Sequence, residues 1–306
     1  MVSLTFKQLE AIREVARTGT VVQAAQVLHV TPTALTSRIK ILEEDLGLAL
    51  FDRTGGRLRL TDAGREVVAA SARMDRLIAD LADTLGAMKG LHGGRVRIGA
   101  GSTAKYFAPR LIAAFLQQHP GIDFTLAVGN RAEIVASLRG YEIDIALMGH
   151  PPCDFGVDSK AFGPHPHVII ASPDHPLARG GRVSKADLAN QNFIVREEGS
   201  GTRSMFEYFF NGVTLGPPKI SIEIGSNETI KQAVMAGLGL SLISAHTIAP
   251  EVAEGRLAVL RVEGLPILRQ WFAIRRSDRE LPPAGLALWE FIVKRGRDFL
   301  PQRESA

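Results

Sequence analysis

Cysteine is almost absent from this chain of 306 residues, which contains only Cys153. A single cysteine excludes any disulfide within the chain and is typical of proteins from a reducing cytoplasm, where we expect this one. Cys153 follows two prolines and lacks the sequence context of a known nucleophile. We therefore expect a structural residue at this position and no catalytic thiol.

Long apolar runs are also missing, because none approaches the ~18–20 residues that a membrane-spanning helix needs. The first residues, Met1 to Lys7, do not show a basic segment followed by an apolar core. We expect neither a signal peptide nor a membrane partner.

Catalytic patterns are equally scarce, since no paired-carboxylate, Ser/His/Asp or phosphate-loop arrangement stands out. His165-Pro166-His167 is the one segment that suggests a metal, yet no cysteine or carboxylate set accompanies it. We expect no enzyme activity, no bound metal and no resident cofactor.

The charge balance is basic but modest. Lysine and arginine exceed aspartate and glutamate by four over the chain, and the first 60 residues carry eight basic and six acidic side chains. Such a balance is compatible with nucleic acid without proving it. The length predicts two or three domains of ordinary globular composition.

Three short helices are predicted at the start of the chain. Apolar residues recur at helical spacing over 5–17 and an alanine-rich segment covers 22–28. The third helix, 32–46, begins with Thr31 as a cap and Pro32 at the first helical position, and Gly47 ends it. A short helix, a tight turn and a capped helix are typical of a helix-turn-helix.

The outer face of the third helix carries the candidate DNA contacts. Leu35, Ile39 and Leu42 form its inner face. The small hydroxyls and basic groups at its start and on its outer face suit base edges and phosphates; these candidates are Thr31, Pro32, Thr33, Thr36, Ser37, Arg38 and Lys40. The alternative is an ordinary three-helix bundle with solvated polar positions.

A strand over 48–53, a turn over 54–57 and a returning strand over 58–60 predict a hairpin. Arg53, Arg57 and Arg59 would carry its charge to the DNA backbone or the minor groove. The hairpin is therefore a candidate wing.

A long helix follows, because no proline occurs between Thr61 and Pro109. Its apolar residues step by three or four, close to a heptad seam: Val67, Ala70, Met74, Leu77, Leu81, Leu85 and Met88. Such an exposed stripe needs a partner, either a second copy of the helix or the C-terminal part of the same chain. Gly90, Gly93 and Gly94 predict a hinge after it.

Strands and helices alternate from Arg95 onward, which predicts an open, mainly parallel sheet flanked by helices. We expect two interleaved subdomains, with crossings near Pro164 and Leu268. A ligand would bind between them, beyond the strand ends.

Three hydroxyl-bearing helix starts follow strands of this region: Ser102-Thr103, Ser200 to Arg203, and Ser226-Asn227. Free backbone N–H groups and the helix dipole favour an anion at such starts, although a serine or threonine there is often only a cap. Arg203 could pair bidentately with a phosphate or carboxylate, or could be solvated.

Residues 6–9, 24–28, 42–47, 50–53 and 60–64 resemble the N-terminal signature of the LysR-type transcriptional regulators. The resemblance implies a winged helix-turn-helix that binds double-stranded promoter DNA as a homodimer, with RNA polymerase as a further partner. Thr33-Ala34-Leu35-Thr36 stands where many members have Pro-Ala-Val-Ser, a difference that concerns base preference.

Segments 144–152, 171–178, 199–203, 225–239 and 265–271 are similar to the Calvin-cycle branch of that family, the CbbR regulators of RuBisCO operons. The resemblance implies homotetramers that bend promoter DNA and small anionic effectors such as ribulose bisphosphate, phosphoglycolate, phosphoenolpyruvate or NADPH. Matching the family's motifs places the effector at Ser102, Thr103, Met148, Gly149, Pro151, Thr202, Arg203 and Asn227. His150 stands where closer relatives are expected to have arginine, which argues against a highly charged ligand.

The expected fold class is an all-α winged helix-turn-helix with a long linker helix, followed by an α/β effector domain of two subdomains like a periplasmic binding protein. The expected boundaries are 1–60 for DNA binding, 61–90 for the linker, 95–164 with 268–306 for subdomain I, and 165–267 for subdomain II. The expected function is transcriptional control of Calvin-cycle genes. The alternatives are a LysR-type regulator of another pathway with a carboxylate or aromatic effector, a metabolite-binding protein without DNA function, and an enzyme built on the cleft.

Overall fold

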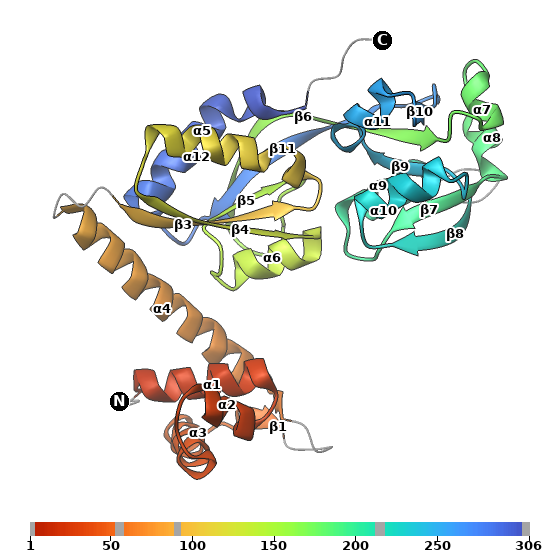
Figure 1. The fold of residues 1–306 in the computed structure, drawn as a ribbon. Helices are drawn as coiled ribbons and strands as arrows, with labels where there is room; N and C mark the ends of the chain where they lie inside the picture. Colours follow the sequence, from red (N-terminus) through yellow and green to blue (C-terminus); the bar gives the residue numbers. More distant parts are fainter. Residues whose placement is uncertain (1–3, 53–57, 89–92, 212–217, 302–306) are drawn as a thin grey trace. The chain divides into compact units, whose positions relative to one another are not determined.

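The computed structural model describes residues 4–52, 58–88, 93–211 and 218–301 (Figure 1). The chain divides into two compact units, Met1–Ala82 and Asp83–Ala306. The division falls inside one continuous helix, α4 (Asp62–Met88).

The first unit begins with the three predicted helices, α1 (Phe6–Thr18), α2 (Val21–Val27) and α3 (Pro32–Leu46). Their ends confirm the sequence signals to within a residue or two. The Thr31 hydroxyl accepts a hydrogen bond from the Ala34 N–H, and Gly47 closes α3 with a φ of 66°. The left-handed backbone conformation at that position favours glycine, which has no Cβ to clash.

The core of this unit holds α3 by its inner face. Leu35, Ile39 and Leu42 are buried against α1 and α2, where Ala24 and Ala25 allow the helices to approach closely. Burial fixes the rotation of α3 about its axis, so the opposite face is presented to solvent.

The hairpin is shorter than predicted. Only β1 (Phe51–Asp52) and β2 (Arg59–Leu60) pair, and they run antiparallel. The predicted strand over 48–53 was wrong at its start because the Glu43 carboxylate accepts the backbone N–H groups of Leu50 and Phe51, at 2.7 and 3.3 Å. The predicted turn, with Arg53 and Arg57, lies outside the described residues.

Helix α4 starts where the hairpin ends. Thr61 caps it, because its hydroxyl accepts the Gly64 N–H and donates to the Ala49 carbonyl. Gly64 lies so close to the hairpin that a Cβ there would meet the Leu50 carbonyl oxygen at 2.1 Å. An ion pair between Arg13 and Asp75 joins α1 to α4.

The predicted apolar stripe of α4 is largely exposed. Met74 is 39% exposed and Leu77 is 64% exposed, Leu81 and Leu85 lie between these values, and Val67 and Ala70 are half-buried. The predicted seam position Met88 has a side chain outside the described part of the chain. An exposed stripe of this length is a surface that calls for a partner.

The second unit is built on a seven-stranded sheet in the order β10-β6-β11-β5-β3-β4, with β9 also paired to β6. Its strands are β3 (Gly94–Gly101), β4 (Ile122–Gly129), β5 (Ile145–Met148), β6 (Val157–Ala171), β9 (Ser241–Ser244), β10 (Ala258–Val259) and β11 (Ile267–Arg276). The pairs of β3 with β4 and β5 are parallel, whereas β11 and β6 pair antiparallel with each other, and β11 with β5. The expectation of a mainly parallel sheet was therefore wrong for β6 and β11.

Helices cover both faces of the first lobe, which contains β3, β4 and β5 (Figure 1). Helices α5 (Ala108–Gln118) and α12 (Pro283–Arg295) pack on one face, and α6 (Arg131–Arg139) packs on the other. Strand β5 alternates accordingly, since Ile145 and Leu147 join one core cluster and Ala146 and Met148 the other.

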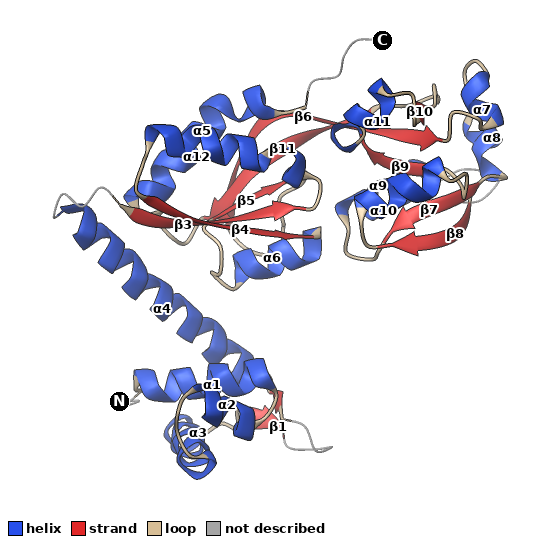
Figure 2. Ribbon diagram, viewed as in Figure 1, coloured by secondary structure: helices blue, strands red, loops and turns tan. Residues whose placement is uncertain are grey.

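The second lobe repeats this plan with parallel strands β7 (Asn192–Arg196) and β8 (Lys219–Ile224), shown in red in Figure 2. Helix α9 (Gly201–Phe210) packs in the core cluster of Phe193, and α10 (Asn227–Met235) in that of Ile194. Smaller elements complete the unit: η2 (Ala104–Tyr106), α7 (Pro176–Arg179), α8 (Lys185–Ala189), η3 (Ala245–Thr247), α11 (Ala249–Ala253) and η4 (Gly296–Phe299).

Strands β6 and β11 connect the two lobes as a paired ladder. Their register runs from Ile267 opposite His167 to Arg276 opposite Val157, and it places Pro164 opposite Gln270 and Leu268 opposite Pro166. The predicted crossing points therefore lie side by side in one ladder. Over the described ranges, no helix combines the length and apolarity that crossing a membrane requires.

Two glycines of α4 allow a matched test of this packing. Gly64→Ala is expected to destabilise the chain by about 1–3 kcal/mol, because a backbone carbonyl cannot move aside easily. Gly86→Ala meets nothing within 4 Å and is expected to be neutral or to stabilise by up to ~1 kcal/mol. Urea unfolding followed by circular dichroism measures both, and equal effects would contradict the close approach of α4 to Leu50.

Candidate functional site

The second unit contains a cavity of about 390 Å³. It lies where β3 and β5 end, at the start of α9 and against the paired strands β6 and β11. Its lining comprises Gly101, Ser102, Thr103, Arg131, Met148, Gly149, His150, His165, His167, Ser200, Gly201, Thr202, Ser204, Met205, Tyr208, Arg269 and Trp271. Ligands of α/β proteins bind at such strand ends.

One wall of the cavity is a single face of the β6–β11 ladder. Arg269 lies opposite His165 in the register, and residues two apart on a strand point to the same face. His165, His167, Arg269 and Trp271 therefore share this face. The His165 ring stacks on the Trp271 ring with centroids 3.9 Å apart and planes 17° apart.

His165 and His246 stack on Trp271 and His167 lies beside His165, and burial keeps all three rings neutral. Burial lowers the pKa of His167 and of His246 from the ordinary value near 6.5 to about 4. Burial, together with the neighbouring imidazoles His167 and His246, lowers the pKa of His165 well below its usual range. The sequence also raised a metal site at His165-Pro166-His167. In the described ranges, no group of three or more histidine, cysteine or acidic side chains could hold a metal ion.

Hydrogen bonds assign the protons of two of these rings. Trp271 Nε1 donates to His246 Nδ1 at 3.1 Å, so the proton of His246 resides on Nε2. His167 Nδ1 lies 3.2 Å from the His165 carbonyl oxygen and donates to it. His165 differs, because both of its ring nitrogens are buried without a hydrogen-bond partner.

Positive charge and a helix N-terminus lie around the cavity. Helix α9 begins there, capped by the Ser200 hydroxyl, which accepts the Thr202 N–H at 3.3 Å. Arg131 and Arg269 add two guanidinium groups, and none of the described lining residues carries a carboxylate. Free N–H groups, a helix N-terminus and two arginines together favour an anion.

Of the predicted effector residues, the structure brings five to this cavity: Ser102, Thr103, Met148, Gly149 and Thr202. Pro151, Arg203 and Asn227 lie outside the lining. The Pro151 carbonyl oxygen accepts from Arg131 Nη2 at 3.5 Å, so Pro151 neighbours the site through its backbone.

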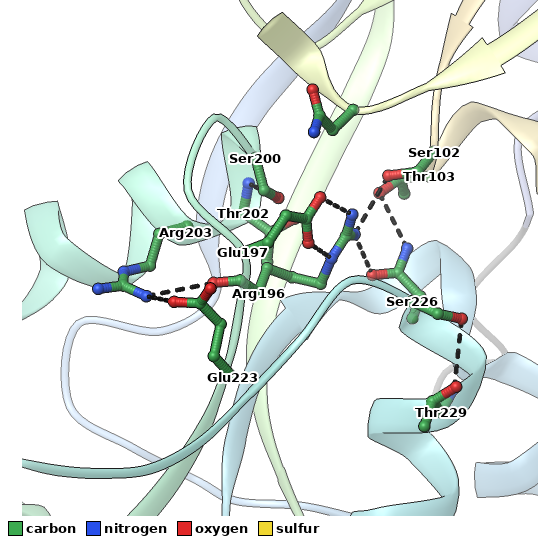
Figure 3. A network of polar contacts seen from close by, with 12 residues as sticks. Ser102, Thr103, Arg196, Glu197, Ser200, Thr202, Arg203, Glu223, Ser226 and Thr229 are labelled. Atoms are coloured by element: carbon green, nitrogen blue, oxygen red, sulfur yellow. Dashed lines mark hydrogen bonds and ion pairs between the residues drawn. The ribbon is translucent and has the colours of Figure 1, made fainter. Parts of the chain in front are cut away.

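The sequence left open whether Arg203 binds an anionic ligand or is solvated. In the structure, Arg203 pairs with two carboxylates of the protein. Its Nε lies 2.7 Å from Glu207 Oε1 and its Nη1 lies 3.1 Å from Glu223 Oε2. Figure 3 shows Arg203 directed to Glu223, whereas Arg196 reaches Ser102. Arg203 therefore stabilises the α9–β8 region of the second lobe.

Arg196 is the residue that sequence reasoning missed. It is 2% exposed and donates to both Glu197 oxygens, at 2.7 and 2.8 Å. It also donates to Ser102 Oγ at 3.1 Å and to Asn227 Oδ1 at 2.6 Å, while Asn227 Nδ2 donates to Thr103 Oγ1 at 3.4 Å (Figure 3). We call these residues the interlobe clasp, because Ser102 and Thr103 follow a strand of the first lobe and the others belong to the second. The position of Arg196 at the end of the buried strand β7 was the sequence feature that could have identified it.

A second contact reinforces the clasp at Glu228, the first-turn acid of α10. Its carboxylate accepts from Lys105 Nζ at 2.6 Å and from the Tyr106 hydroxyl at 2.5 Å, both from the first lobe. Burial alone would raise the pKa of Glu228, but hydrogen bonds from Lys105, Tyr106, the Glu228 backbone and Ser226 together outweigh it and lower the pKa to about 2. The predicted helix start Ser226-Asn227 therefore serves contact between the lobes.

In the first unit, the outer face of α3 is solvent-exposed as predicted. Thr31, Pro32, Thr33, Thr36, Ser37 and Lys40 are exposed and Arg38 is half-buried. The Thr36 hydroxyl donates to the Pro32 carbonyl at 2.9 Å, and its oxygen can still accept a hydrogen bond. Arg59 is exposed on β2.

The histidine cluster makes the stability of the chain depend on pH. His165, His167 and His246 bind protons more weakly when folded, so below about pH 6.5 the unfolded chain takes up more protons. The free energy of unfolding should then fall as the pH is lowered from about 6.5 towards 4, by at most about 1.4 kcal/mol per pH unit for each histidine. Urea titrations across this range should show a shallower slope for His167→Gln and an unchanged slope for His119→Gln, which lies outside the cluster. Equal slopes in wild type and His167→Gln would contradict this account.

Comparison with known families gives two matches. Residues 6–65 match the family described as bacterial regulatory helix-turn-helix protein, lysR family. Residues 89–297 match the LysR substrate binding domain. The two matches cover the described helix-turn-helix and the whole of the cavity.

Related proteins agree with these matches. The chain is 46% identical over 299 residues to the "HTH-type transcriptional regulator CbbR" of Xanthobacter flavus, covering 97% of this chain and 90% of that protein. It is 42% identical over 292 residues to the "RuBisCO operon transcriptional regulator" of Allochromatium vinosum, covering 95% and 96%. The regulatory domain of Synechocystis PCC6803 CcmR, solved in complex with 2-PG, superposes with a TM-score of 0.63 at 34% identity, covering 66% of this chain and 96% of that domain. The first two relatives are named as transcriptional regulators, and the chain belongs to the LysR family of DNA-binding transcriptional regulators.

Proposed function

We propose that this regulator controls transcription of RuBisCO and other Calvin-cycle genes in response to a small anionic metabolite. The names of its relatives support the pathway. The observation that carries the effector class is the cavity lined by Arg131, Arg269 and the start of α9, with no carboxylate among its described residues.

The proposed DNA contact is made by the outer face of α3 in the major groove. Its N-terminal turn carries Thr31, Pro32 and Thr33, and Thr36, Ser37, Arg38 and Lys40 continue the same surface. Arg59 and the predicted wing arginines Arg53 and Arg57 would bind the backbone beside it. This division assigns base reading to α3 and phosphate contact to the hairpin.

The proposed assembly is a homodimer formed through the apolar stripe of α4, with effector domains that join two dimers into a homotetramer. The stripe supports pairing because Leu77, Leu81 and Leu85 are exposed at near-heptad spacing. Two heads on a paired helix would bind half-sites in successive major grooves. RNA polymerase is the expected partner at the promoter.

The proposed link between effector and DNA passes through the interlobe clasp. Ser102 lines the cavity and also accepts a hydrogen bond from Arg196, so an anion that engages Ser102 alters one of the contacts that hold the lobes together. The effector can shift the assembly only by its differential affinity for the two lobe arrangements.

An effector from another pathway is the second candidate. The stacked rings of His165 and Trp271 on one cavity wall favour it, because they offer a flat apolar surface to an aromatic acid. Titration of the purified regulator with ribulose bisphosphate, phosphoglycolate, phosphoenolpyruvate and NADPH, beside simple and aromatic carboxylates, distinguishes the two candidates.

Arg38→Ala is expected to weaken binding to the promoter of the host RuBisCO operon about tenfold or more, since a base-contacting arginine contributes roughly 1–3 kcal/mol. Gel-shift titration at fixed salt measures the effect. Arg179→Ala is the control, because Arg179 is exposed in the other unit and pairs with Asp174. Equal affinity of Arg38→Ala and wild type would overturn the assignment of α3.

Arg131→Gln is expected to weaken effector binding about tenfold or more, because it removes one charge-assisted contact to the anion. Isothermal titration calorimetry with the metabolites above measures it. Arg110→Gln on α5 is the matched control, since Arg110 is exposed and donates to the Phe299 carbonyl away from the cavity. An anion that binds Arg131→Gln as tightly as wild type would remove Arg131 from the site.

A further inference from the structure

Arg269 is a cation of the cavity wall that no carboxylate neutralises in the described part of the chain. It is half-buried and lines the cavity. No hydrogen bond or ion pair to a described residue engages its guanidinium, whereas the buried Arg196 donates to Glu197 and Asn227. The enclosed nitrogens without partners belong to other described residues, so the donors of Arg269 are accessible. A guanidinium always carries its charge and five N–H donors, so one in this setting calls for an acceptor.

The side chains that share the face of Arg269 on the β6–β11 ladder are uncharged. His165 lies directly opposite, His167 is the diagonal neighbour on β6, and Trp271 is two residues further along β11. Burial holds the pKa of both histidines well below the ordinary value, so both rings are neutral. Among the described residues, this wall of the cavity therefore offers the charge of Arg269 no counter-charge.

Tyr208 of α9 holds the Arg269 guanidinium in place. The Arg269 Cζ atom lies 5.4 Å from the centroid of the Tyr208 ring, within the range of a cation–π contact. Tyr208 also lines the cavity and is 64% exposed, so it contributes little to the core. The ring attracts the cation without offering the oxygen acceptors of a carboxylate, so the N–H donors stay available to a ligand.

Arg131 marks a different position along α9. A Cβ at Gly201, the first residue of α9, would lie 3.8 Å from Arg131 Cδ. Tyr208 lies two turns further along the helix, about 10 Å from Gly201 at 1.5 Å per residue. The cavity therefore has two cationic positions, one with Arg131 at the start of α9 and one with Arg269 over Tyr208.

We propose that Tyr208 positions Arg269 to bind a second anionic group of the effector, so that the cavity selects molecules with an anionic group at each end. The inference rests on the proposed anionic effector and adds a second subsite to it. Arg269 is the specificity-determining residue of this subsite, and Tyr208 is its positioning residue. The second group is a carboxylate or a phosphate, because a guanidinium binds either through two parallel N–H groups.

Pairs of anions that differ in the second anionic group test this subsite. One pair is pentane-1,5-diol bisphosphate with pentyl phosphate, and the other is 3-phosphooxypropanoate with propyl phosphate. Calorimetric titration of the full-length regulator at fixed salt is expected to show about tenfold or tighter binding of the two-ended member of at least one pair, because the contact to Arg269 is charge-assisted.

Three substitutions separate the subsite from general attraction between charges. Arg269→Gln should remove most of this preference and leave the one-ended anions bound as before. Arg131→Gln should weaken both members of a pair, because it acts on the group that they share. Arg261→Gln is the matched control, since it removes the same charge from an exposed position outside the cavity lining and should keep the wild-type preference.

Substitutions of Tyr208 test whether its ring acts through Arg269. Tyr208→Phe keeps the ring face and should keep the preference. Tyr208→Leu removes the ring face and should weaken the two-ended anions about threefold to tenfold, with the one-ended anions unchanged. Combined with Arg269→Gln, Tyr208→Leu should cause no further loss, since the cation that the ring holds is then absent.

The thermal midpoint provides a readout that does not depend on ligand. Arg269 engages no carboxylate of the described chain and Tyr208 is largely exposed, so Arg269→Gln and Tyr208→Leu should both unfold near the wild-type temperature. A large fall in the midpoint of Arg269→Gln would show that the guanidinium has partners within the protein and would overturn the inference.

The outcomes distinguish the levels of the proposal. If two-ended anions bind no tighter than one-ended anions, or if Arg269→Gln keeps the wild-type preference, the second subsite is refuted and the anionic effector stands. If Tyr208→Phe loses as much affinity as Tyr208→Leu, or if Tyr208→Leu weakens Arg269→Gln further, positioning by the ring is refuted. If no anion of either pair binds, the anionic effector itself is refuted and the second subsite with it.

Discussion

The backbone ladder between β6 and β11 is the constraint on which the second unit depends. Ten residues of β11 pair with β6; β11 also pairs with β5, and β6 also pairs with β9 and β10. The ladder therefore connects the two lobes. One of its faces places His165, His167, Arg269 and Trp271 at the cavity. A slip of β11 by one residue against β6 would turn Arg269 and Trp271 away from the cavity.

Charge is divided between the cavity and the clasp. Arg196 is buried, but Glu197, Ser102 and Asn227 engage its donors, so it holds the lobes together. Arg131 and Arg269 face the cavity, where the described lining offers no carboxylate. Arg196 is buried and therefore needs the partners that it has, whereas Arg131 and Arg269 are only half-buried and remain available to an anion.

In the DNA-binding unit, burial likewise decides which side chains are exposed. Buried Leu35, Ile39 and Leu42 hold α3 in one rotation, and that rotation determines which hydroxyls and basic groups face outward. Gly64 allows α4 to begin directly against the hairpin, because its missing Cβ leaves room for the Leu50 carbonyl. The linker helix α4 therefore begins at the same core that positions α3.

The sequence by itself determined the elements whose signals are local: the caps at Thr31 and Gly47, the period of α4 and the strand–helix alternation of the second unit all depend on neighbours within a few residues. Five of the eight effector residues that it predicted lie in the cavity lining. Only the tertiary structure decided the direction of β11, the carboxylate partners of Arg203, the burial of Arg196 and the unmatched ring of His165. Those properties arise from contacts between residues far apart in the sequence, such as Arg196 with Ser102 and Ile274 with Ala146. No periodicity or spacing along the chain encodes which distant partner a side chain meets.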